Sequence, residues 1–130
     1  NIMNSLIIDA AADNIFLTLI SNKNIYTCSH ENSKSNFERL IILINRFLKK
    51  NKILIDEINK IYINRGPGSF AGIRCSISIA KGLFITKKID YYCFSFLDFN
   101  KSVTIRYEDV PYLCNKFKIK KNLINPIYLS

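Results

Sequence analysis

The sequence predicts an α/β domain in which an antiparallel meander of three strands is followed by helix, strand, helix and strand. Three observations support this order. Short β-rich segments alternate with polar breaks over the first thirty residues, a later segment has the spacing of an amphipathic helix, and a strand-like run leads through a glycine turn into a second helix. With 130 residues the chain has the length of one domain.

The meander strands are expected at residues 5–11, 15–20 and 25–29, because these runs are rich in Ile, Leu and other β-forming residues. The breaks between them, residues 12–14 and 21–24, consist of small and polar residues. Such short connections join strands that are neighbours in the sheet and run antiparallel.

The first helix is expected over residues 36–49, where apolar residues recur at helical spacing. Together they cover about 160° of the helix surface, which is wider than a minimal core-facing stripe. Two interpretations stay open: a small domain buries a broad face, or part of this face meets a partner. The apolar residues are Phe37, Leu40, Ile41, Leu43, Ile44, Phe47 and Leu48.

A buried strand at residues 60–64 precedes a glycine-rich turn, whose residues are Arg65, Gly66, Pro67, Gly68, Ser69 and Phe70. Ser69 is the expected N-cap of the second helix, because its hydroxyl can accept from free N–H groups of the first turn. This helix should run to about Lys87. Besides an apolar stripe it carries a stripe of small residues that would let another backbone approach closely: Ala71, Cys75, Ser78 and Gly82.

A last strand at residues 91–95 completes the element order of a ribonuclease H-like, actin-type core. We expect residues 1–95 to form one actin-like lobe and residues 96–130 to pack on it as a short remnant of a second lobe. Within that remnant, residues 103–107 are expected as a strand, residues 110–119 have no clear preference, and residues 125–130 are expected to be extended because of Pro126.

Composition excludes some classes of protein. Hydrophobic residues make up 48% and charged residues 22%, which excludes wholesale disorder. The longest aliphatic run is far too short for a membrane span, and no signal peptide is recognisable at the start, so we expect a cytoplasmic protein. The net charge of +9 has two explanations: a polyanionic partner, or A+T-rich codons that favour Lys, Asn and Ile.

No residue pattern predicts catalysis, a metal site or a cofactor. The four cysteines lack metal-ligand spacing and are expected as free thiols, and His30 is the only histidine. The glycine turn fits neither a P-loop nor a dinucleotide fingerprint. A two-metal nuclease could use Asp9 and Glu38, but Asn64 and Arg65 stand where a third acid would be needed.

The segment from Asn64 to Arg74 resembles the G-R-G-P-G-S-F-T-G-x-R block of the TsaB (YeaZ) family. Three further segments follow in the family's order. Residues 6–11 resemble its opening I-D-T-S strand, residues 77–83 its I-x-x-A-x-G-L segment, and residues 126–129 its closing P-x-Y-L.

The resemblance implies an actin-like fold and a non-catalytic scaffold role in the tRNA N6-threonylcarbamoyladenosine (t6A37) pathway. Members of the family pair through two helices with TsaD, the catalytic paralogue, and the ATPase TsaE joins them. The same helices can form homodimers, and contact with tRNA is expected to be indirect or weak. Here the helices correspond to residues 36–49 and 70–86, and the implied interface consists of Phe37, Leu40, Ile41, Ile44, Ala71, Cys75, Ser78 and Gly82.

The chain departs from the family pattern in several places, and in the first helix Asn36 and Phe37 stand where the family often has His-Ser. Ala10 and Ala11 replace Thr-Ser after the first strand, Ala71 replaces Thr, and only about thirty residues lie where a second lobe is usual. These departures argue against nucleotide binding. Two alternatives to the scaffold remain: an ATPase-like protein that uses Asp9 and the glycine turn, and a basic module that contacts tRNA.

Overall fold

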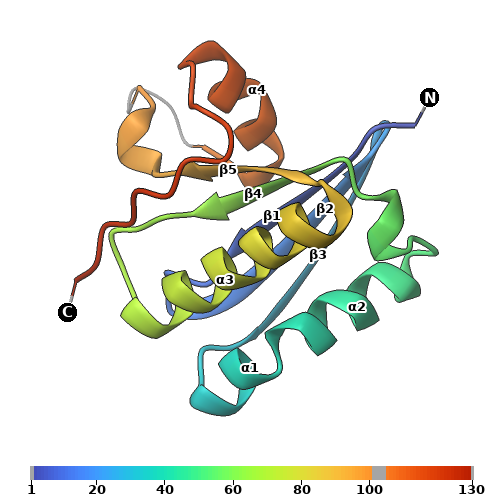
Figure 1. The fold of residues 1–130 in the computed structure, drawn as a ribbon, viewed down its shortest axis with the longest axis horizontal. Helices are drawn as coiled ribbons and strands as arrows, with labels where there is room; N and C mark the ends of the chain where they lie inside the picture. The colour runs from blue at the N-terminus through green and yellow to red at the C-terminus, as the bar shows by residue number, and fades with distance from the viewer. Residues whose placement is uncertain (1, 101–104, 130) are drawn as a thin grey trace.

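The computed structural model describes residues 2–100 and 105–129, and its centre is a five-stranded sheet of order β3-β2-β1-β4-β5 (Figure 1). The strands are β1 (Asn4–Asp9), β2 (Asn14–Ser21), β3 (Asn24–Glu31), β4 (Lys60–Asn64) and β5 (Asp90–Phe94). The helices are α1 (Lys34–Glu38), α2 (Leu40–Lys50), α3 (Phe70–Lys87) and α4 (Val110–Lys116). Three short 3-10 turns complete the elements: η1 (Ile55–Glu57), η2 (Phe96–Asp98) and η3 (Tyr107–Asp109).

The pairing of the strands confirms the predicted meander. β1 and β2 run antiparallel with Leu6 opposite Leu19, and β2 pairs antiparallel with β3. β4 then pairs parallel with β1, and β5 pairs parallel with β4. A parallel neighbour requires a crossover connection, which α1 and α2 provide between β3 and β4 and α3 provides between β4 and β5.

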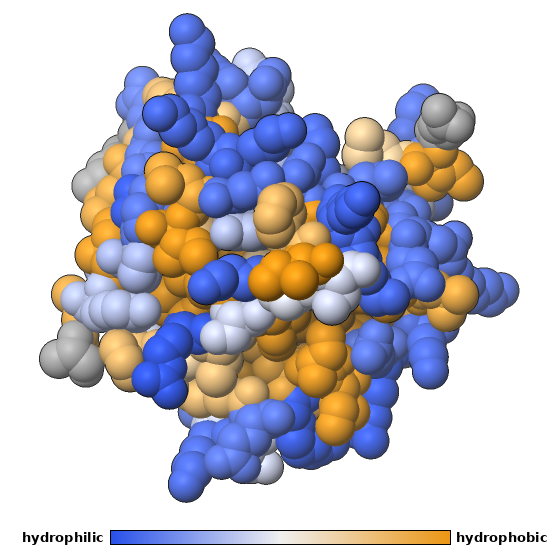
Figure 2. Space-filling model, in the orientation of Figure 1, coloured by the Kyte–Doolittle hydropathy of each residue, from blue (hydrophilic) through white to orange (hydrophobic). Residues whose placement is uncertain are grey.

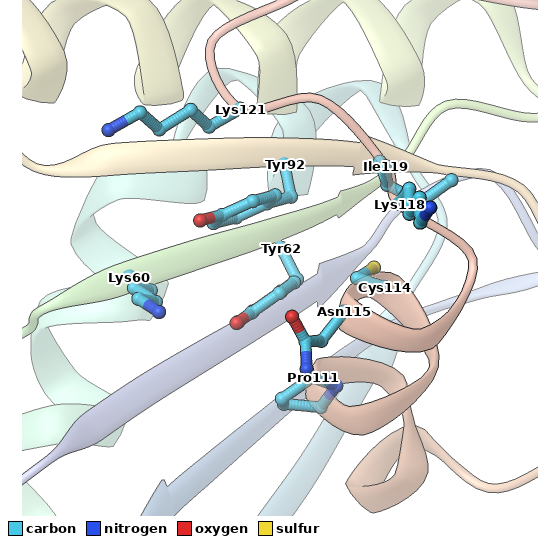
Figure 3. Close-up of a pocket in the computed structure, with 9 residues that line it drawn as sticks. All are labelled: Lys60, Tyr62, Tyr92, Pro111, Cys114, Asn115, Lys118, Ile119 and Lys121. Atoms are coloured by element: carbon cyan, nitrogen blue, oxygen red, sulfur yellow. The ribbon is translucent and has the colours of Figure 1, made fainter.

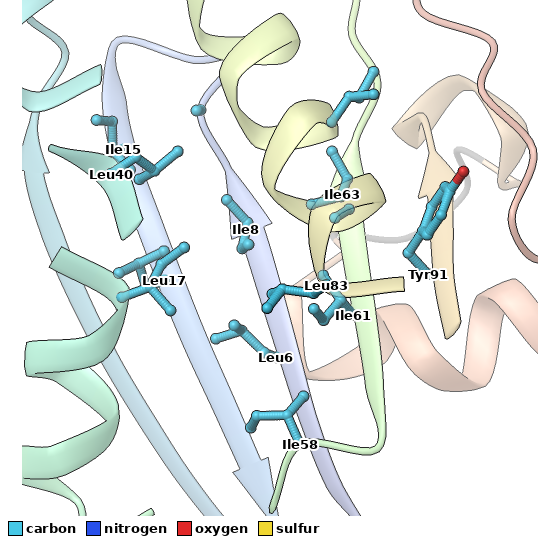
Figure 4. Close-up of a cluster of buried hydrophobic side chains, with 14 of the residues drawn as sticks. Leu6, Ile8, Ile15, Leu17, Leu40, Ile58, Ile61, Ile63, Leu83 and Tyr91 are labelled. Atoms are coloured by element: carbon cyan, nitrogen blue, oxygen red, sulfur yellow. The ribbon is translucent and has the colours of Figure 1, made fainter. Parts of the chain in front are cut away.

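The two faces of the sheet carry different layers, as the alternation of side chains along a strand requires. On one face Leu6 and Ile8 join the main core beneath α2 and α3 (Figure 4). On the other face Ile7 packs with Phe94, Phe99 and Val110 from the C-terminal part of the chain. In Figure 1, α4 therefore lies on the opposite side of the sheet from α2 and α3.

The expected first helix is divided at Arg39, whose φ of −105° and ψ of 13° leave the helical region. Before this break, Ser33 caps α1 by accepting from the Asn36 N–H at 3.2 Å. After it, α2 buries Leu40, Leu43, Ile44, Phe47 and Leu48 against the sheet. The apolar spacing predicted this helical segment but not the break within it.

The C-terminal part differs most from the sequence prediction. The strand expected over residues 103–107 is wrong where the structure describes it, because residues 105 and 106 lie outside any strand and Tyr107 opens η3; residues 103 and 104 lie outside the described part. The segment without a clear preference contains α4, whose first turn holds Pro111. Near the end, Tyr128 forms an isolated bridge with Gly68, in agreement with an extended segment. None of the helices in residues 2–100 and 105–129 is long and apolar enough to cross a membrane.

Candidate functional site

The glycine turn after β4 lies where three parts of the chain meet. Gly66 has a φ of +111°, and its N–H donates to Asn64 Oδ1 at 2.9 Å. A side chain at this position would overlap the carbonyl oxygen of Ile127, so both the dihedral angle and the space require glycine. The Ile127 N–H in turn donates to the Arg65 carbonyl at 2.7 Å, which ties the C-terminal segment to the turn.

The other side of the turn contacts the first hairpin. The Ser69 N–H donates to the Ala11 carbonyl at 3.1 Å, and a Cβ on Gly68 would overlap the same carbonyl oxygen. The Ser69 hydroxyl accepts from the Gly72 N–H at 3.2 Å, which confirms the predicted N-cap of α3. Pro67 lies exposed at the tip of the turn. The turn therefore sets the start and direction of α3.

The Arg65 side chain forms its hydrogen bonds within the domain. Its guanidinium forms a two-pronged contact with Asp98, with Nη2–Oδ1 at 2.7 Å and Nε–Oδ2 at 3.4 Å, and Nη1 donates to the Asn125 carbonyl at 2.9 Å. Both side chains are largely shielded from solvent. Such a fork holds η2 and the C-terminal segment against the end of β4, so this cation is already neutralised.

These contacts disfavour the ATPase alternative. A phosphate loop needs backbone N–H groups that point toward an empty site. Here the N–H groups of Gly66, Ser69 and Gly72 all donate within the protein, and Pro67 has none. Phe70, the last residue of the turn, packs its ring on Tyr128 with centroids 4.6 Å apart.

Asp9 ends β1 and is 2% exposed. One carboxylate oxygen accepts from the Ala11 N–H at 3.0 Å, and the other accepts from the Tyr107 hydroxyl at 2.5 Å. Glu38, the second acid of the nuclease alternative, is exposed on α1 beside Lys34. Within residues 2–100 and 105–129 no three acidic, histidine or cysteine side chains gather into a metal site. Asp9 and Glu38 therefore do not form the two-metal arrangement that was considered for a nuclease.

The small-residue stripe of α3 points outward. Ala71, Ser78 and Gly82 are exposed and Cys75 is half-buried. A Cβ built on Gly82 would meet nothing within 4 Å, so the packing of this domain does not explain a glycine there. Ile85, one turn further along, is 73% exposed. Ile85 continues the same helical spacing, but it was not among the interface residues predicted from the sequence.

The residues singled out on the first helix are divided between core and surface. Leu40 and Ile44 are at most 1% exposed, so they offer no surface to a partner while the domain is folded. Phe37 is half-buried against Gly72, whereas Ile41 is 38% exposed. Ile42, which the apolar spacing had not selected, is 45% exposed and lies beside it. An exposed Ile within a helix is visible only once the buried side of that helix is known.

We use the name outer helix face for the small-residue stripe of α3 with Ile85, together with the exposed Ile41 and Ile42 of α2. Figure 2 looks onto it: hydrophobic side chains gather over α3 and toward α2, and hydrophilic side chains surround them. An exposed apolar patch with a polar rim is typical of interaction sites, so this face is the candidate interface. The face consists of Ile41, Ile42, Ala71, Cys75, Ser78, Gly82 and Ile85.

The mixed sheet with its crossover helices defines the class of the protein: it is an α/β protein of the actin-like, ribonuclease H-like fold. YeaZ from Pseudomonas aeruginosa shares this fold, with a TM-score of 0.66 and 19% identity over 72% of this chain and 44% of that one. Residues 30–113 match the family model "TsaD: tRNA N6-adenosine threonylcarbamoyltransferase", which is more than half of the chain.

Curated relatives narrow the assignment. The tRNA threonylcarbamoyladenosine biosynthesis protein TsaB of Buchnera aphidicola subsp. Schizaphis graminum is 33% identical over 92 residues, 71% of this chain and 44% of the relative. TsaB of Escherichia coli strain K12 is 28% identical over 81 residues, 62% of this chain and 35% of the relative. The chain belongs to the TsaB (YeaZ) family. It spans less than half of the length of these curated relatives.

Proposed function

We propose that this chain is a non-catalytic scaffold subunit of the machinery that makes t6A in tRNA, and that it pairs with a TsaD-like catalytic paralogue through its outer helix face. The observation that carries the proposal is the exposed stripe of α3, on which Gly82 has open space in front of it. The names of the TsaB relatives supply the pathway.

The chemistry of the outer helix face suits helix-to-helix contact. Small side chains at Ala71, Cys75 and Ser78 let the backbone of a second helix approach closely. Ile85 continues this stripe with apolar surface, and Ile41 exposes apolar surface on α2. Neither α3 nor α2 needs this surface for its own packing, because the opposite sides of both helices already bury the main core. A face of this kind on a two-helix layer would bury about 1,200–2,000 Å² in total in a stable pair.

The contacts of the family block, residues 64–74, support a non-catalytic role. Arg65, Asn64 and Ser69 all bond within the protein, and they position α3. Asp9 is likewise engaged by Ala11 and Tyr107. The chemistry would therefore be done by the partner. The same proposal includes a TsaE-like ATPase as a third component, a homodimer through the same face when the chain is alone, and a cytoplasmic location.

The test is light scattering on the chain alone and mixed with the TsaD-like protein of the same organism. A 1:1 heterodimer is expected, and it should replace any homodimer. Ser78→Glu should abolish this pairing, because it would place a carboxylate in a contact from which water is excluded. Circular dichroism should show that the variant keeps its fold, since Ser78 is exposed in the isolated domain.

Ser29→Glu is the matched control, because Ser29 is also an exposed serine but lies on β3, away from both helices. It should pair normally. If Ser78→Glu pairs as well as Ser29→Glu does, the outer helix face is not the interface and the proposal fails.

A further inference from the structure

A second feature lies on the face of the sheet opposite α2 and α3. It is a pocket of about 300 Å³ where the first residues of β4 and the middle of β5 meet the end of α4 (Figure 3). This volume is at the lower end of the range for small-molecule sites. The residues that line the pocket include Lys60, Tyr62, Tyr92, Asn115, Lys118 and Lys121.

The strand register builds the floor of this pocket. Lys60 and Tyr62 are alternate residues of β4, so both side chains leave the same face of the sheet, while Ile61 points into the main core. Tyr92 is the register partner of Tyr62 on β5. The two rings stack with centroids 5.0 Å apart and planes 15° apart, and the Lys60 ammonium lies 5.9 Å from the Tyr92 centroid.

The donors other than Lys118 lie at one end of the pocket (Figure 3). In Figure 3 the hydroxyls of Tyr62 and Tyr92 and the ammonium groups of Lys60 and Lys121 point toward the same side of the pocket. Within residues 2–100 and 105–129, neither tyrosine hydroxyl has a protein hydrogen-bond partner, so both are available to a ligand. Burial raises the pKa of Tyr62, which keeps that hydroxyl protonated and able to donate.

The charge of the pocket is positive. Lys121 lies 3.6 Å from Asp90, which also accepts from the Asn122 amide at 2.9 Å. Lys60 and Lys118 form no ion pair with any residue that the structure describes. Lys60 and Lys121 with one carboxylate, beside two hydroxyl donors, form a set of groups that favours an anion with several oxygen acceptors.

We propose that this pocket binds a phosphate group, held by the ammonium groups of Lys60 and Lys121 and by the hydroxyls of Tyr62 and Tyr92. The phosphate would come either from the backbone of an RNA strand or from a free phosphorylated small molecule, since the chemistry of recognition is the same. The pocket and the outer helix face lie on opposite sides of the sheet, so neither site depends on the other.

The experiment uses two probes on the full chain: inorganic pyrophosphate followed by amide NMR shifts, and a fluorescein-labelled single-stranded RNA followed by anisotropy. Pyrophosphate should shift the resonances of Lys60, Tyr62 and Tyr92. For each probe that binds the parent chain, Lys60→Gln should weaken binding about tenfold, which is the loss expected for one charge-assisted hydrogen bond. Tyr92→Phe, which removes only a hydroxyl, should weaken it about fivefold.

Lys23→Gln is the control for charge alone, because Lys23 is an exposed lysine in the turn between β2 and β3. If pyrophosphate binds and RNA displaces it, the phosphate belongs to RNA; if RNA does not compete, a small phosphorylated molecule is the source. Either result supports the proposal. It is overturned if neither probe binds, or if Lys23→Gln weakens binding as much as Lys60→Gln does.

The phosphate pocket and the outer helix face can be tested independently. Lys60→Gln should leave pairing with a TsaD-like protein unchanged, and Ser78→Glu should leave pyrophosphate binding unchanged. Thermal melts of each variant check that the fold is retained. The fold should tolerate Gln at position 60, because Lys60 is the first residue of its strand.

Discussion

The hydroxyl of Tyr107 donates a 2.5 Å hydrogen bond to the buried carboxylate of Asp9, although 98 positions separate the two residues. Asp9 ends the first strand, and Tyr107 opens the 3-10 turn before α4. The bond therefore fastens the C-terminal layer to the end of β1. Burial and the neighbouring Asp9 carboxylate raise the pKa of Tyr107, so the hydroxyl remains the donor at neutral pH.

Tyr107→Phe should destabilise the domain by about 1–3 kcal/mol, because it takes a hydrogen bond from a buried carboxylate while keeping the ring that packs on Phe16. Urea unfolding followed by circular dichroism measures the change. Tyr112→Phe is the matched control, since the Tyr112 side chain is exposed on α4; its effect should stay within about 0.5 kcal/mol. Equal stabilities for the two variants would contradict the role given to this bond.

Two glycines of α3 should respond in opposite directions to alanine. At Gly72 a Cβ would overlap the Ala10 carbonyl oxygen, so Gly72→Ala should destabilise the domain by about 2 kcal/mol or more. At Gly82 a Cβ meets nothing, so Gly82→Ala should stabilise the isolated chain by up to about 1 kcal/mol through helix propensity. Thermal unfolding of both variants provides the comparison. A loss of stability in Gly82→Ala would mean that this face is already covered.

Stability should fall in alkaline solution. Burial raises the pKa of the Cys93 thiol from 9.0 to about 11 and that of Cys114 to about 12. The unfolded chain then releases these protons at lower pH than the folded chain, so deprotonation favours unfolding as pH rises above 9.0. The urea midpoint should therefore decrease between pH 9.0 and about 11.

Cys93→Val separates the thiol from the other groups that titrate in this range. It removes one buried ionisable group, and its urea midpoint should decrease less steeply over the same pH interval. A midpoint that rises with pH in the parent chain would be inconsistent with the burial of Cys93 and Cys114.

Short-range sequence patterns were sufficient to predict most of the strands and helices. Alternating β-rich runs and polar breaks located β1, β2 and β3, and the glycine turn with Ser69 located the start of α3. These features depend on residues within a few positions of one another, and their physical causes are local: strand alternation, a glycine at positive φ and an N-cap hydroxyl.

The candidate site was only partly predictable. Helical spacing selected Leu40, Ile41 and Ile44 together, but the sheet covers Leu40 and Ile44 and leaves Ile41 exposed. Which part of a broad apolar face meets the core depends on how the helix is rotated against the sheet, and periodicity does not contain that angle. Ile42 and Ile85 became candidates for the same reason.

The sequence by itself determined the order of the strands and main helices along the chain and the family block at residues 64–74, because both depend on short-range patterns of residues. Tertiary structure decided what those patterns face. It joined Tyr107 to Asp9 and placed Lys60, Tyr92 and Lys118 around one pocket. Contacts between residues so far apart arise from sheet register and from the layer in which each segment packs, and neither is encoded at a single position.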